Sequence, residues 1–311
     1  MFPGTGIRYA FSHTKKYIDL RGVKVSDESD NASCLDSGDS ASSDDSVPIH
    51  RRKDDATGDS AGQDGDAGPD EGGGQDDAAV TDDGGGGFFN RPVRTYVIRA
   101  GRMTESERRN YEELHQVWCI PFEHRTLNFA EIFGNTNPVT IEVGFGMGQA
   151  TAQSAAEHPD MNYLGIEVHV PGVGRLLGEI KKRQLKNLFI IEHDALEILE
   201  AMIPDGSIEA FHIFFPDPWP KKKHHKRRLM QRPRTELLAS KLIAGGYLYF
   251  VTDWEEYAQS ALAELEATEG LSNKYADFAP HQDWRPRTKF EQKGLDADRE
   301  IRELFFVKDE A

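Results

Sequence analysis

The stretch VTIEVGFGMGQATAQSAAEHPDMNYLGIE, residues 139–167, decides the fold of this chain. Residues 139–143 form an apolar run typical of a buried strand, and residues 163–167 form a second one. A glycine loop and a helix predicted over residues 149–157 lie between them. Because two strands joined by a crossover helix run in the same direction, this stretch predicts a parallel pair inside a sheet.

The same alternation of strand and helix continues through the chain. We expect further strands over residues 188–192, 210–215 and 247–252, and helices over residues 173–184, 196–202, 234–243 and 254–267, with Gly245-Gly246 ending the helix that starts at residue 234. A capping box at Thr104–Glu107 predicts an earlier helix, and residues 285–291 and 304–308 predict late strands at an antiparallel edge. The chain is therefore expected to be an α/β protein, with a mostly parallel central sheet and helices on both faces.

Composition divides the chain into two regions. Residues 26–86 consist mainly of Asp, Ser, Gly and Ala, and they carry 18 acidic against 3 basic residues. Such a segment buries too little apolar surface to offset the entropy of ordering, so residues 1–86 are predicted to be a disordered N-terminal extension. Residues 87–311, the predicted folded domain, carry a net charge of only −5, which is compatible with a nucleic-acid partner.

Cysteine usage and hydropathy predict a cytoplasmic protein. The two cysteines, Cys34 and Cys119, have neither the spacing of a zinc site nor that of a disulfide framework. No apolar run near the N-terminus resembles a signal peptide, and none reaches the length of a membrane span. We therefore expect no membrane partner and no metal site.

Acidic side chains recur where the predicted strands end. In a parallel sheet, ligands bind beyond the carboxyl ends of the strands, at the point where strand order reverses. One acid accompanies each of the five predicted parallel strands: Glu142, Glu167, Asp194, Asp217 and Asp253. Together they predict one site along that edge.

The glycine loop, with Gly144, Gly146 and Gly148, favours a nucleoside ligand. A dinucleotide fingerprint needs a third glycine where Gln149 stands, which disfavours NAD or FAD. Glu167 follows at a spacing that suits ribose hydroxyls, and Asp194 suits an adenine amino group. For the glycines alone, a tight strand-to-helix turn explains the pattern equally well.

The segment FFPDPWPKKKHHKRR, residues 214–228, combines a carboxylate, an indole and a block of cations. Prolines on both sides restrict the backbone of Asp217 and so set its direction. Trp219 either stacks on a base or packs the end of the sheet. The basic run suits phosphates, although a solvated helix face has the same composition. Its two histidines lack a third metal ligand at suitable spacing.

Together these segments resemble the tRNA (guanine-N7-)-methyltransferase family of the bacterial single-subunit type. The matching motifs extend over residues 95–308 and are IEVGFGMG, YLGIEVH, HDA, FFPDPW with the basic run, TDW and RPRTKFEQKG. The resemblance implies a Rossmann-like class I methyltransferase fold, S-adenosylmethionine as donor, and N7 of guanosine 46 in the tRNA variable loop as acceptor. It also implies a monomer or homodimer without an obligate partner subunit.

Site residues follow from the resemblance, motif by motif. Asp217 is implied to be catalytic. The cofactor is implied to contact Glu142, Gly144, Gly146, Gly148, Glu167, Asp194 and Asp217. Substrate contacts are implied for Lys221, Asp253, Thr288, Lys289, Phe290 and Glu291. Contacts with RNA are implied for Lys223, His224, His225, Lys226, Arg227 and Arg228.

Guanine N7 is unprotonated at neutral pH, so its methylation needs alignment and no general base. Asp217 is predicted to stabilise the positive charge that develops on the base. Asp253 either grips the same base or caps the helix that follows, and Thr288, Lys289 and Glu291 are equally typical of an edge strand. Two other functions remain open: methylation of a different base or a small molecule, and tRNA binding with a vestigial donor pocket.

Overall fold

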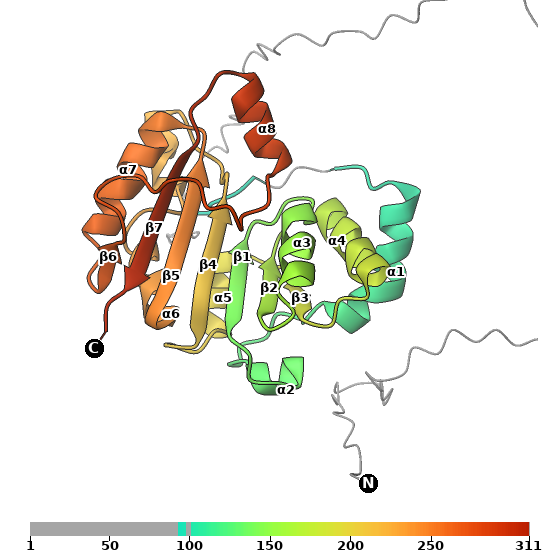
Figure 1. Cartoon of the computed structure of the whole chain (residues 1–311). Coiled ribbons are helices and arrows are strands. Elements are labelled where there is room, and N and C mark those ends of the chain that lie inside the picture. Colours follow the sequence, from blue (N-terminus) through green and yellow to red (C-terminus); the bar gives the residue numbers. More distant parts are fainter. Residues whose placement is uncertain (1–92, 98–100, 311) are drawn as a thin grey trace, which may run out of the picture. The chain divides into compact units, whose positions relative to one another are not determined.

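The computed structural model describes residues 93–97 and 101–310, so the predicted disordered extension, residues 1–86, lies outside it. Within the described residues a seven-stranded sheet runs in the order β3-β2-β1-β4-β5-β7-β6 (Figure 1). The strands are β1 Val139–Val143, β2 Asn162–Ile166, β3 Leu188–Ile191, β4 Ile208–Phe214, β5 Leu242–Thr252, β6 Leu271–Asn273 and β7 Arg302–Lys308. The first strand has the bounds expected from the sequence.

Strand direction confirms the predicted fold class. Strands β1 to β5 are parallel to one another, and β7 is antiparallel to both β5 and β6. The chain adds β2 and β3 on one side of β1 and then returns to place β4 on the other side. Strand order therefore reverses between β1 and β4, as in Rossmann-like sheets. The antiparallel strand β7 is not the edge, because the short strand β6 lies beyond it.

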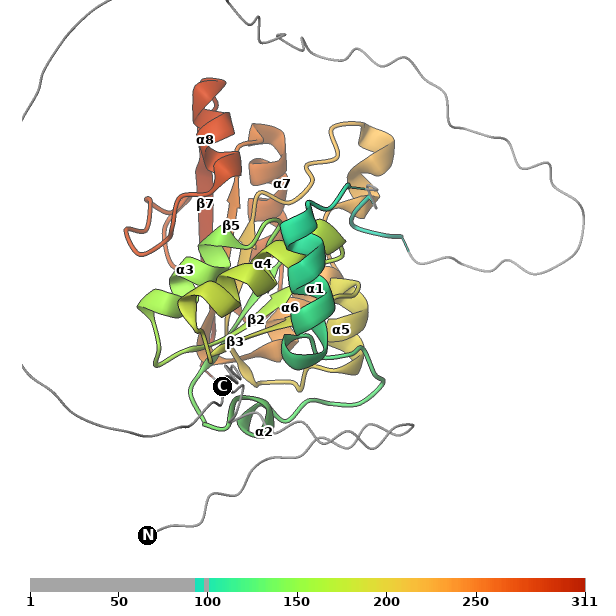
Figure 2. The ribbon, with the colours of Figure 1, turned by 90° about the vertical axis from the view of Figure 1, so that its right-hand side faces the viewer.

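Helices cover both faces of the sheet. The helices are α1 Glu105–Trp118, α2 Phe129–Phe133, α3 Gln149–Glu157, α4 Val170–Arg183, α5 Ala195–Ala201, α6 Arg234–Lys241, α7 Glu255–Glu266 and α8 Lys289–Asp296. Figures 1 and 2 show α3 and α4 on one face, with α1 packed against α4, and α5, α6 and α7 on the other. In the described part of the chain, no helix combines the length and apolar character needed to cross a bilayer.

Local signals explain several helix starts. Thr104 is the N-cap of α1: its hydroxyl accepts from the backbone N–H of Glu107, and its own N–H donates to the Glu107 carboxylate at 2.8 Å. This is the capping box read from the sequence. Helix α4 begins at Val170, three residues before the prediction, because Pro171 fits the first turn, where no N–H partner is needed.

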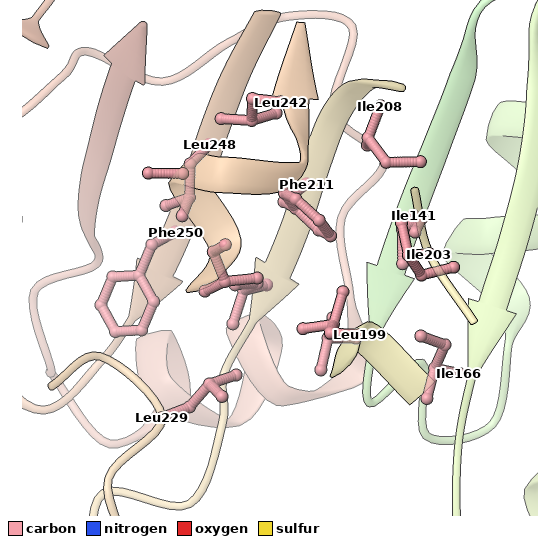
Figure 3. Packing of buried hydrophobic residues seen from close by; sticks show 14 of the residues in the cluster. Ile141, Ile166, Leu199, Ile203, Ile208, Phe211, Leu229, Leu242, Leu248 and Phe250 are labelled. Atoms are coloured by element: carbon pink, nitrogen blue, oxygen red, sulfur yellow. The ribbon is translucent and has the colours of Figure 1, made fainter. Parts of the chain in front are cut away.

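The main core lies between the sheet and helices α5, α6 and α7. Ile141, Phe211 and Leu248 are partners across β1, β4 and β5, and all three are fully buried. Figure 3 shows them in one apolar layer with Leu199 and Ile203. Since side chains alternate along a strand, the next residues along β1, β4 and β5 lie on the opposite face. These are Glu142, His212 and Tyr249, and each of them is also buried.

Two sequence expectations were wrong. Residues 285–291 do not form a strand, because a second capping box, between Thr288 and Glu291, starts helix α8 there. Gly245-Gly246 does not end a helix either: α6 stops at Lys241, and both glycines lie inside β5. A Cβ at Gly246 would lie 2.8 Å from the Glu209 carbonyl oxygen, so this glycine allows close backbone pairing with β4.

Candidate active site

The predicted site residues gather at the carboxyl edge of the sheet. The glycine loop follows β1 and the proline segment follows β4, so they flank the point where strand order reverses. Helix α8 lies at the same end of the sheet (Figure 1). Sequence spacing placed these segments on one edge, but it did not predict α8.

Glu167 holds the glycine loop against the end of β2. Its carboxylate accepts from the backbone N–H of Gly146 at 2.7 Å, and also from the N–H groups of Val168 at 2.7 Å and His169 at 3.0 Å. Gly144 has a positive φ of 76°, and a Cβ added there would meet no atom within 4 Å. Open space therefore borders the loop where the backbone turns.

Glu142 is a buried acid with an unusual proton affinity. Burial raises the pKa of its carboxyl to about 7; the Thr151 hydroxyl partly offsets this, and the nearby Glu167 carboxylate raises it further. A carboxyl in this state is poised to release its proton when a cation arrives beside it.

Asp194 is the N-cap of α5, a role that the sequence analysis did not assign. Its Oδ1 accepts from the N–H of Leu196 at 2.8 Å. The phenol of Tyr96 hydrogen-bonds to Asp194, and burial followed by the Asp194 charge raises the pKa of that phenol. Tyr96 lies in a stretch that looked only basic and mixed, so no motif pointed to it.

The backbone around Asp217 is held in an uncommon conformation. Phe215 and Trp219 have positive φ angles of 51° and 49°, and the prolines on either side of Asp217 restrict the chain between them. The Asp217 side chain is exposed. A carboxylate is thus presented outward on a stiff loop beside the glycine loop.

Trp219 contacts the basic run and Thr95, and these contacts leave both alternatives from the sequence, stacking on a base and packing the end of the sheet, as predictions. Its Nε1 donates to the Thr95 carbonyl oxygen at 3.2 Å, and the Arg227 guanidinium lies 4.9 Å from the centre of its ring. The ring of His224 meets it edge-on at 5.9 Å. The indole therefore joins the proline segment, the basic run and residues 93–97.

The basic run is a short 3-10 helix, Lys222–Arg227, with its lysines at the surface. Arg228, by contrast, is only 2% exposed. Its guanidinium pairs with the Glu256 carboxylate, its Nε donates to the Pro218 carbonyl oxygen at 2.9 Å, and it lies over the Tyr257 ring. The expected RNA contact from Arg228 is inconsistent with this burial; the side chain instead ties the loop to α7.

Asp253 does not cap α7. The N-cap is Trp254, without a side-chain hydrogen bond, and the Asp253 carboxylate pairs with Arg299 at 2.8 Å. Helix α8 passes directly over it, because a Cβ at Gly294 would lie 3.0 Å from the Asp253 Cβ. Only glycine allows this approach without a shift.

The segment Thr288–Glu291 divides into inward and outward side chains. Thr288 and Glu291 form the capping box of α8, and Glu291 is buried. Lys289 is exposed, and Phe290 is 55% exposed, an unusual fraction for a large apolar side chain. A Cβ at Gly146 would lie 3.6 Å from the Phe290 ring, so the ring borders the glycine loop.

Comparisons with known proteins match this chain to methyltransferases. A family model described as "Putative methyltransferase" matches residues 136–304. A tRNA (guanine-N(7)-)-methyltransferase of Thiobacillus denitrificans is 46% identical over 214 residues, covering 69% of this chain and 94% of that protein. One from Treponema pallidum is also 46% identical and covers 70% and 96%. The chain belongs to the tRNA (guanine-N7-)-methyltransferase family.

Solved structures include a more distant likeness, the 16S rRNA methyltransferase KamB, at 14% identity and a TM-score of 0.44 over 58% of this chain and 93% of that one. Within this member of the tRNA (guanine-N7-)-methyltransferase family, residues 136–304 include every acid of the carboxyl edge. Thr95 and Tyr96 lie outside that range. Their contacts with Trp219 and Asp194 are visible only in the folded chain.

Proposed function

We propose that this protein transfers the methyl group of S-adenosylmethionine to N7 of guanosine 46 in the variable loop of tRNA. Membership of the tRNA (guanine-N7-)-methyltransferase family supports methyl transfer as the reaction and tRNA as the substrate. The arrangement around the β1–β4 reversal supports it, because buried and loop-bound acids lie on one side and the exposed Asp217 on the other. Donor and acceptor would meet between them.

The acids of β1, β2 and β3 fit the chemistry of the donor. S-adenosylmethionine carries an ammonium, a ribose diol and an adenine amino group, and when bound it supplies an activated methyl on a sulfonium. Glu142 would pair with the ammonium, Glu167 would accept from the ribose, and Asp194 would accept from the adenine. The open space beside Gly144 is where backbone and ligand would come together.

Asp217 would act on the acceptor by electrostatics and alignment. Guanine N7 carries no proton at neutral pH, so the protein needs no base to activate it. Positive charge develops on the guanine ring as the methyl is transferred, and a carboxylate fixed beside the ring stabilises that charge. Holding the reacting atoms in line supplies about 7 to 11 kcal/mol of the barrier in favourable cases.

Exposed cations would hold the RNA. Lys221 and Lys223 stand at the surface next to the Asp217 loop, and they would neutralise phosphates near the target base. Lys289 and Phe290 would meet the base from the side of α8. Asp253, now paired with Arg299, would contact the substrate only if that pair opened. We also propose that the enzyme is cytoplasmic and needs no second subunit.

The test is transfer of labelled methyl from S-adenosylmethionine to unmodified tRNA, with chemical cleavage at 7-methylguanosine to locate the product. We expect label at guanosine 46, and a loss of at least 100-fold in kcat for Asp217→Asn. The exposed Asp298→Asn change serves as a control of equal charge. Label at another nucleotide, or none despite donor binding, would reject the proposed acceptor.

A further inference from the structure

Arg285 is the most completely buried cation at this end of the molecule. Its side chain is 0% exposed, yet it lies in the connection between β6 and β7 and belongs to no helix or strand. Its guanidinium donates to both Glu291 carboxylate oxygens, at 2.7 and 3.0 Å, to Glu303 Oε1 at 3.0 Å and to the Tyr249 hydroxyl at 3.2 Å.

Each of these partners lies on a different element. Glu291 is in the first turn of α8, Glu303 is on β7 and Tyr249 is on β5. The Tyr249 hydroxyl also donates to Glu303, and His281 Nδ1 lies 3.0 Å from Glu303 Oε1 and 3.2 Å from an Arg285 guanidinium nitrogen, so five side chains form one network. Burial alone would lower the pKa of Arg285, but Glu291 and Glu303 together raise it above its ordinary value. The guanidinium stays charged and fastens α8 to the sheet.

The fastened turn is the one that carries exposed residues toward the glycine loop. Glu291 closes the capping box with Thr288, so its two carboxylate oxygens serve both Arg285 and the helix start. Lys289 and Phe290 lie between these two residues and point outward. Removing charged side chains from water costs free energy, and apolar side chains of similar size would fill the same space without that cost. A role in placing this turn explains why the network is there.

We propose that Arg285 is a positioning residue for the acceptor: through Glu291 it sets the first turn of α8 so that Phe290 and Lys289 meet the RNA. It does not touch the substrate. This inference rests on the proposed function for its kinetic consequences, while the anchoring of α8 is independent of any activity. Arginine is needed because a lysine ammonium lacks the planar fork that reaches two carboxylates and a phenol at once.

The experiment compares Arg285→Lys with Arg183→Lys, which makes the same change in a surface pair with Glu179 on α4. Hydrogen exchange of the α8 amides, residues 289–296, is measured first. We expect at least tenfold faster exchange in Arg285→Lys, with β4 amides unchanged and no effect of Arg183→Lys. In methyl transfer, KM for tRNA should rise about tenfold, with the Kd for S-adenosylmethionine unchanged by calorimetry.

A third variant, Phe290→Ala, tests the route of the effect. It leaves the ion pairs intact, so α8 exchange should stay slow while KM for tRNA rises. If Arg285 acts through this turn, the double variant is no worse than the poorer single variant. Unchanged α8 exchange in Arg285→Lys, equal weakening of donor binding, or fully additive KM effects would overturn the inference. Absence of tRNA methylation by the unaltered protein would instead reject the proposed function, and the exchange result would still decide whether Arg285 anchors α8.

If Arg285→Lys does not fold, Glu303→Gln offers a milder change. It keeps the Arg285–Glu291 pair and removes only the charge on β7. We expect it to show the same increase in α8 exchange to a smaller degree, about threefold. No increase in this variant, with its fold intact, would also count against anchoring through the sheet.

Discussion

The Arg228 guanidinium and the Glu256 carboxylate form a two-point pair that joins the end of the basic run to α7. Arg228 is buried and Glu256 is half exposed, so the pair sits at the boundary between core and solvent. Its position makes Arg228 part of the scaffold beneath the loop, whereas the lysines before it face the surface. The two kinds of cation should respond differently to substitution.

Replacing Arg228 with alanine should lower the free energy of unfolding by about 2 kcal/mol. The change leaves the Pro218 carbonyl and Glu256 without their charged donor, and it empties the space over Tyr257. Urea unfolding measures the loss. Lys226→Ala, an exposed neighbour, should change stability by less than about 0.5 kcal/mol. Equal effects of the two substitutions would contradict the scaffold role.

Exposed lysines of the basic run should control the salt dependence of tRNA binding. For Lys223→Ala we expect the slope of log affinity against log salt concentration to become shallower by about 0.7, because one phosphate contact is lost. The control is Lys186→Ala, since Lys186 is exposed just before β3 and so lies at the opposite edge of the sheet. Filter binding at several salt concentrations gives both slopes. A change in affinity without a change in slope would mean that Lys223 does not pair with phosphate.

The two capping boxes offer a matched pair of substitutions. Thr104→Ala and Thr288→Ala each remove one helix cap, and each should cost about 1 kcal/mol of stability. Only Thr288→Ala loosens the turn that carries Phe290, so only this variant should raise KM for tRNA, by about fivefold. Steady-state kinetics and thermal unfolding, made on both variants, separate the two effects. If KM rises equally in both, the turn has no special part in RNA binding.

Glu142 should make the protein less stable as pH rises. The native chain keeps the Glu142 proton up to about pH 7, whereas the unfolded chain releases it near pH 4.5. The native state therefore binds more protons between these values, and the free energy of unfolding falls across this window by about 3 kcal/mol from this residue. The stabilising effect is complete below pH 4.5 and is lost above pH 7.

Glu142→Gln isolates this contribution. The unfolding free energy of the unaltered protein minus that of this variant should fall by about 3 kcal/mol from pH 4.5 to pH 8. Glu113→Gln is the control, because Glu113 lies at the surface, where Lys181 lowers the pKa of its carboxyl. For Glu113→Gln, the unfolding free energy of the unaltered protein minus that of the variant should not fall over this pH range. A constant difference for Glu142→Gln would show that the native carboxyl is charged throughout.

Buried strands and glycine turns made much of the fold predictable. Along the first βαβ unit, apolar runs of four or five residues are separated by a glycine loop and a helix, and few other arrangements satisfy that pattern. The strand predicted over residues 285–291 was wrong because Thr288 and Glu291 form a capping box of the same kind as the one at Thr104, and this box starts a helix. Strand β6 was not predicted, because an alternation of apolar and polar residues cannot be recognised over only three residues.

The location of candidate site residues at strand ends was predictable, whereas contacts with partners distant in the sequence were not. Asp194, Asp217 and Asp253 each follow a strand, as expected, and their roles in the site stay predictions. Arg285 carries no local signal of burial, since its partners come from β5, β7 and α8. The burial of Arg228 was not predicted for the same reason. A basic run indicates exposed side chains, and the partners that Arg228 has in the folded chain, Glu256 and Tyr257, are distant in the sequence.

The order β5-β7-β6 also bears on how the protein is made. Strand β7 is synthesised after β5 and β6, yet it lies between them in the sheet. Among the strands of the described residues, β6 pairs only with β7, and Glu303 of β7 completes the network under α8. The half of the site that would bind S-adenosylmethionine, built on β1 to β3, has all its strands while synthesis continues. The half that would receive tRNA is complete only once β7 has been made, so on a nascent chain the donor half would form before the acceptor half.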